Sequence, residues 1–129
     1  INIDTRSIKF ADDDFMGRIH SDKVTSAMVK TITSETAEGE TITNLDLFMR
    51  AVNAYLDKHP RINHNMMVMV RQLQPTQWGL PIEFYCFSAN VNWVPYETLQ
   101  AEIISYIVAL APMFKLRIYQ APSGLDIRR

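Results

Sequence analysis

Acidic, histidine and cysteine side chains are the residues of this sequence best suited to chemistry. Aspartates occupy positions 12–14, and several carboxylate oxygens are what Mg²⁺ or Ca²⁺ requires. The later glycine and glutamate of a calcium-binding loop are missing, so we favour the alternative of a solvated acidic turn or a helix start.

The chain also holds His20, His59 and His64, whose spacing matches no metal-binding motif. We expect neither metal ligation nor general-base catalysis from them. His59 stands at an expected helix end, where the helix dipole favours a cation.

Cys86 is the only cysteine, which excludes an internal disulfide and favours a reducing compartment. Its expected place on the covered face of a hairpin indicates a buried, inert thiol. The sequence has no nucleophile elbow, no phosphate-binding glycine loop and no pair of catalytic carboxylates. We therefore expect a protein that is not an enzyme, with no catalytic residues, no bound metal and no cofactor.

Size and composition indicate one soluble domain. The chain has 129 residues, of which 47% are apolar and 21% are charged. The net charge of −1 argues against nucleic acid as a partner. No apolar run approaches the roughly 20 residues that span a bilayer. The chain begins with IleAsnIleAsp, without an initiator Met, so we expect a fragment of a longer protein.

Apolar periodicity and turn residues predict the elements. A helix after residue 43 has Thr43 or Asn44 as its cap and ends at His59, before Pro60. A second helix has Pro95 at its first position and stops at Pro112. The remaining expected elements are opening strands in 1–10, a polar excursion of low packing density in 11–43 with at most one short helix capped by Ser21, a hairpin in 66–87, a last strand in 115–119 and a tail in 125–129.

This order predicts an α+β domain of the ferredoxin-like (βαββαβ) class over residues 44–124, with two helices on one face of a four-stranded antiparallel sheet. The hairpin then has two apolar faces. With Gln77 at its centre, Arg71 faces Glu83. The face expected under the helices carries Val68, Val70, Phe84 and Cys86. The face left open carries Met67, Met69, Tyr85 and Phe87, and a bare apolar patch of this kind is usually a partner surface.

RNA recognition motifs share this element order and stack bases on aromatic residues of the open sheet face. Their third strand needs a basic residue and glycines, whereas this chain has Glu83 and no glycine in IEFYCF. Contact with protein is the better interpretation of the open face.

An ordered series of segments resembles a known family. It consists of TNLDLF at 43–48, AYLDKHPRI at 54–62, VRQLQP at 70–75, GLPIEFYCF at 79–87 and PSG at 122–124, with INIDTRSIKF at the opening. Together they resemble the C-terminal cytoplasmic domain of bacterial small-conductance-type mechanosensitive channels, closest to the miniconductance branch. Residues 11–42 match that family poorly.

The resemblance implies a vestibule domain on the cytoplasmic side of the bacterial inner membrane, which residues 1–10 would enter from an upstream β-domain. Copies of the chain would form a ring, possibly a heptamer, and upstream segments would cross the membrane. Such channels open under membrane tension in hypoosmotic shock. The alternative is a small-molecule-sensing regulatory domain, because fold by itself does not choose a function.

Overall fold

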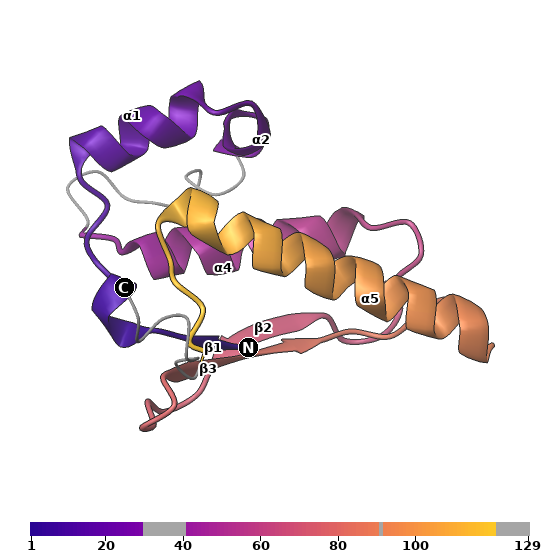
Figure 1. Cartoon of the computed structure of the whole chain (residues 1–129). Helices are drawn as coiled ribbons and strands as arrows, with labels where there is room; N and C mark the ends of the chain where they lie inside the picture. Colours follow the sequence, from indigo (N-terminus) through magenta and orange to yellow (C-terminus); the bar gives the residue numbers. More distant parts are fainter. Residues whose placement is uncertain (30–40, 91, 121–129) are drawn as a thin grey trace, which may run out of the picture.

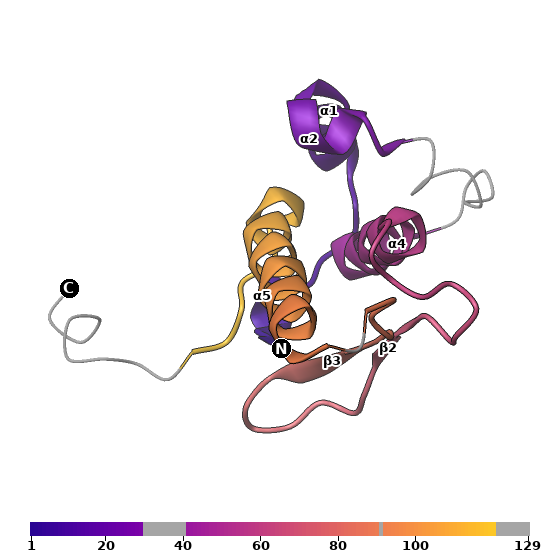
Figure 2. The same ribbon diagram turned by 90° about the vertical axis from the view of Figure 1, so that its right-hand side faces the viewer.

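The structure, a computed structural model, describes residues 1–29, 41–90 and 92–120. A small antiparallel sheet forms one layer, α4 and α5 cross one of its faces, and α1 and α2 lie on the far side of these helices (Figures 1 and 2). The elements in chain order are β1 (Asn2–Ile3), η1 (Thr5–Ser7), α1 (Asp13–Ser21), α2 (Lys23–Ser26), α4 (Asn44–Lys58), β2 (Met69–Gln72), β3 (Leu80–Tyr85), α5 (Trp93–Leu110) and η2 (Ala111–Phe114).

Helix α4 forms as the sequence predicts. The Thr43 hydroxyl accepts the backbone N–H of Asp46 (3.1 Å), and the Asp46 carboxylate accepts that of Thr43 (3.2 Å), which completes a capping box. The helix ends at His59, because the residue before Pro60 disfavours the helical conformation. Its apolar stripe, which includes Phe48 and Val52, is buried against the sheet and η2.

Helix α5 starts slightly earlier than predicted, at Trp93, so Pro95 occupies its third position instead of its first. It ends at Leu110, and Pro112 lies in the following turn η2. One side of α5 is buried, since Leu99, Ile103, Ile107 and Leu110 all lie in the core.

The predicted hairpin register is confirmed. Three predicted pairs, Met69–Tyr85, Val70–Phe84 and Arg71–Glu83, are partners between β2 and β3. Arg71 Nε donates to Glu83 Oε2 at 2.6 Å. The face predicted to lie under the helices, Val68, Val70, Phe84 and Cys86, packs against the core.

The predicted ferredoxin-like four-stranded sheet is wrong. Among the described residues the sheet has three strands in the order β1-β3-β2. The expected last strand contributes one bridge, Ile3 to Ile118, with the Asp4 N–H donating to the Arg117 carbonyl (2.8 Å). The reason lies in Asp4, whose carboxylate accepts the Arg6 N–H (3.0 Å) and turns the chain into η1. β1 therefore leaves the sheet after Ile3, too early to pair a full fourth strand.

The polar excursion is also more ordered than predicted. Asp12 caps α1 by accepting the Phe15 N–H (2.8 Å), so the aspartates form a helix start, as the favoured alternative predicts. Phe15 and Ile19 are buried in the core, which contradicts the expected low packing density for this part. Asp22 caps α2 in place of Ser21. Residues 30–40, like residues 121–129, lie outside the described part of the chain.

Gly79 gives a stability prediction at the hairpin loop. Its φ is +100°, and a Cβ there would lie 2.7 Å from the backbone oxygen of Ile3. We expect Gly79→Ala to lower the free energy of unfolding by about 2 kcal/mol, through strain and this clash. Gly17→Ala is the matched control, because a Cβ at position 17 would meet nothing within 4 Å and the helix gains about 0.5–1 kcal/mol. Urea titrations in which both variants shift the same way would contradict this interpretation.

Candidate functional site

Of the four residues that the sequence predicts for the open face of the sheet, Met69 and Tyr85 are paired between β2 and β3, whereas Met67 and Phe87 flank the two strands. Met67 and Tyr85 are 61% and 49% exposed, whereas Met69 and Phe87 are half-buried. The Tyr85 and Phe87 rings meet edge to face with centroids 5.3 Å apart. No described helix lies over this face, because α4 and α5 both cross the opposite one (Figures 1 and 2). We call these four residues the open sheet face.

Charge at the open sheet face is largely neutralised. Strand alternation puts Arg71 and Glu83 on the same side as Met69 and Tyr85, and the two side chains form an ion pair. Both are about half exposed, so the pair adds at most about 1 kcal/mol to stability. Its larger effect is to leave an apolar, aromatic surface without a net charge, which is the composition of interface centres.

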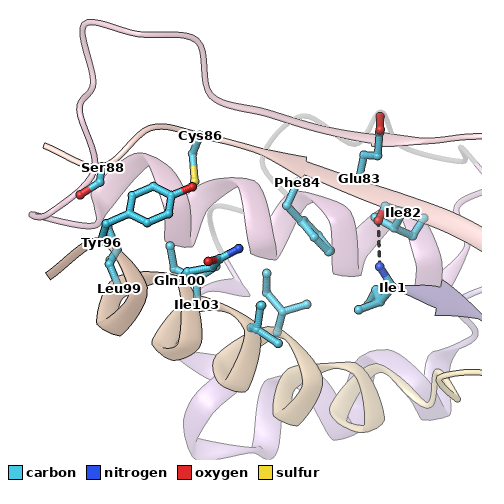
Figure 3. Close-up of a pocket in the computed structure, with 12 residues that line it drawn as sticks. Ile1, Ile82, Glu83, Phe84, Cys86, Ser88, Tyr96, Leu99, Gln100 and Ile103 are labelled. Atoms are coloured by element: carbon cyan, nitrogen blue, oxygen red, sulfur yellow. Dashed lines mark hydrogen bonds between the residues drawn. The ribbon is translucent and has the colours of Figure 1, made fainter. Parts of the chain in front are cut away.

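A pocket lies between β3 and α5, on the other side of the sheet (Figure 3). Its volume is about 440 Å³, and its walls include Ile82, Phe84, Leu99 and Ile103. Figure 3 shows the Tyr96 ring at one end and, at the other, Ile1, whose backbone nitrogen donates to the Ile82 carbonyl (3.2 Å). Sequence patterns did not reveal this pocket, since the apolar residues of β3 and α5 that form its two walls have the spacing of ordinary core residues.

Cys86 lines the same pocket and is half-buried. Burial raises the pKa of the Cys86 thiol, so the thiol stays protonated at neutral pH and is a poor nucleophile. This environment agrees with the predicted inert role.

His59 belongs to a polar cluster that joins the end of α4 to α5. Its Nδ1 accepts the backbone N–H of Arg61 (3.1 Å), so the neutral ring carries its proton on Nε2, which faces Glu102 Oε1 at 3.4 Å. Glu102 also pairs with the Arg61 guanidinium. His64 Nε2 lies 2.8 Å from the His59 carbonyl. Both ring nitrogens of His59 are thus engaged in holding the turn, which leaves neither free to act as a base.

The pKa of His59 shifts in the direction opposite to the one expected at a helix end. The helix end was expected to favour the cation, but burial, followed by the positive charge of Arg61 and then His64, lowers the pKa of His59. Its side chain is almost fully buried, and desolvation outweighs the dipole. Sequence reasoning also missed Glu102 as its neighbour, because 43 positions separate the two residues and no spacing rule connects them.

This lowered pKa gives a pH prediction. The unfolded histidine has a pKa near 6.5 and the folded one lies lower, so the unfolded state binds more protons on acidification. The stability that His59 contributes is present above the unfolded pKa and is lost as the pH falls through the folded pKa. We expect the free energy of unfolding to fall between neutral and mildly acidic pH, and to fall less in His59→Gln. Equal pH dependence of both proteins in denaturant titrations would contradict this, with His20→Gln as the control for an exposed histidine.

Within the described ranges, no three His, Cys, Asp or Glu side chains gather closely enough to hold a metal ion. In the part of the chain that the structure places, no helix combines the length and apolar character needed to cross a membrane. The fold and its surfaces define a small α+β domain with an apolar sheet face turned outward. No family model matches the chain, and no solved structure matches it.

Proposed function

We propose that this chain is the cytoplasmic vestibule domain of a bacterial mechanosensitive channel, a non-catalytic module that assembles with other copies of itself. The observation that carries the proposal is the open sheet face, which exposes Met67 and Tyr85 to solvent. The ordered resemblance of segments between residues 43 and 124 supports the choice of family. The whole channel would form a ring at the inner membrane and open under tension.

The open sheet face has the chemistry of a contact between proteins. Methionine and aromatic residues are enriched in interface centres, where charged residues are depleted. Covering such a face removes apolar area from water at about 25 cal/mol per Å². The solvent-exposed face of an antiparallel sheet normally carries polar side chains. Positions 67, 69, 85 and 87 carry apolar or aromatic side chains instead.

The test uses the intact gene that encodes this chain, expressed in bacteria that lack their own mechanosensitive channels. We expect tension-activated currents in membrane patches and better survival after hypoosmotic shock. Replacing Met67 and Tyr85 together by aspartate is expected to abolish both, because two buried, unpaired carboxylates oppose assembly. Val24→Asp is the matched control, since Val24 is 43% exposed on α2, away from the sheet. Absence of any tension-activated current from the wild-type gene would refute the proposed function.

A small-molecule-sensing domain is the second candidate, and the pocket between β3 and α5 is the observation that favours it. Its volume of about 440 Å³ and apolar walls suit a small ligand. A ligand that binds the folded state raises the melting temperature by mass action. A metabolite screen by thermal shift distinguishes the two candidates. A hit that Ile103→Trp abolishes would favour the sensor, because the larger side chain fills the pocket.

A further inference from the structure

Helix α5 carries a second exposed apolar surface. Val94, Ile104 and Val108 are 69%, 50% and 42% exposed, and Ala101 is exposed between them. Spacings of seven, three and four residues place all four on one side of the helix. We call this set the α5 outer stripe. It lies opposite the buried side of α5, which includes Leu99, Ile103 and Ile107.

Helix α5 has apolar residues on two opposite sides, and an apolar side of a helix is normally covered by a packing contact. The inner side of α5 already packs on the core, so its outer stripe lacks a matching contact among the described residues. The outer stripe is also separate from the open sheet face, because α5 lies across the covered face of the sheet and the open face points away from it (Figures 1 and 2). One chain therefore presents two unlike apolar surfaces.

The two surfaces differ in the size of their exposed side chains. The open sheet face projects large side chains, among them Met67 and Tyr85. The outer stripe is built from β-branched residues around Ala101, with Ser105 exposed beside it. Long, adaptable side chains on one surface and small ones on the other allow close packing.

The two surfaces can also share one ion pair, between Glu97 and Arg71. Glu97 is exposed in the first turns of α5, on the side of the outer stripe. On the open sheet face, Arg71 donates to Glu83 through Nε, which leaves its terminal nitrogens without a partner in the described part of the chain. A guanidinium can serve a second carboxylate through those nitrogens, and Glu97 of a neighbouring copy supplies one.

We propose that the open sheet face of one copy packs on the α5 outer stripe of the next copy. This inference rests on the proposed assembly function and specifies its geometry. A contact between two different surfaces is heterologous, so it continues from copy to copy and closes into a ring when the rotation allows. A self-complementary contact between two sheet faces would instead end at a dimer.

Disulfide trapping of the full chain tests this pairing, in a Cys86→Ser background. It captures transient contacts, so it reports even when association is weak. Met67→Cys and Ile104→Cys are prepared separately and together. We expect covalent dimers when the two single variants are mixed, and a ladder of higher oligomers from the double variant. Val24→Cys mixed with either single variant is the control for random collision.

Two outcomes overturn the heterologous contact. Dimers from Met67→Cys by itself, with none specific to the mixture, would show a sheet-to-sheet contact and leave the assembly function standing. No cross-link above the Val24→Cys control would overturn the heterologous contact, while the currents and the survival of the Met67 and Tyr85 double variant decide the assembly function separately. A charge exchange adds an independent measure. Glu97→Arg is expected to reduce the mixed cross-link about threefold, as for a surface ion pair, and Arg71→Glu in the partner copy to restore it. No restoration would remove the Arg71–Glu97 contact from the interface.

Discussion

Replacing Asn44 by alanine is expected to lower the free energy of unfolding by about 3 kcal/mol, because a fully buried side chain is lost and three backbone groups, all at least partly buried, lose their partner. The Asn44 side chain is fully buried. Its Oδ1 accepts the Lys9 N–H (2.9 Å), and its Nδ2 donates to the carbonyls of Ser7 (3.1 Å) and Phe114 (2.8 Å). One amide therefore ties the chain after η1, the start of α4 and the end of η2 together.

Two comparisons isolate this role of Asn44. Thr43→Ala removes the N-cap of α4 and is expected to cost about 1 kcal/mol. Asn44→Asp keeps the shape but loses both donated hydrogen bonds and buries a charge, so it is expected to destabilise at least as much as alanine. Urea unfolding measures all three variants. An Asn44→Ala cost no larger than that of Thr43→Ala would contradict the bridging role.

Phe48→Ala is expected to have the largest effect in the core, about 4 kcal/mol, since truncation leaves a cavity. Phe48 is fully buried. Its ring meets Phe114 edge to face at 6.0 Å, and Phe114 in turn lies 6.3 Å from Phe15. The three rings join α4, η2 and α1.

Phe10→Ala is the matched control, because Phe10 is 66% exposed and its truncation is expected to change stability by at most about 0.5 kcal/mol. The free energies of unfolding of the two variants are compared by urea titration. Similar costs for Phe10→Ala and Phe48→Ala would mean that the aromatic cluster does not anchor the core.

The parts of the fold that local patterns determine could be predicted from the sequence. Alternation in both strands and the opposite charges of Arg71 and Glu83 fixed one register for the hairpin, because a slip of one residue would exchange its two faces. Spacing of apolar residues and the positions of Pro60 and Pro112 located α4 and α5. The four residues of the open sheet face followed from the same alternation.

The other parts depend on contacts that local patterns do not encode. Leu116 and Ile118 alternate as a strand would, but their pairing depends on the length of β1, which the turn at Asp4 cuts short. The full length of helix α1 was not predicted, because only Phe15 and Ile19 of its residues are buried. Their spacing of four was the available signal, hidden among aspartates and Gly17.

The measurement that tests the central proposal most directly is the labelling rate of a cysteine on the open sheet face. Met67→Cys, in a Cys86→Ser background, is labelled with a maleimide in membranes that contain the complete gene product and in the dilute 129-residue chain. If another copy covers this face, labelling is slowed at least about tenfold in the membranes, since buried thiols react slowly, while Val24→Cys reacts alike in both. Equal rates at position 67 would contradict assembly through the open sheet face.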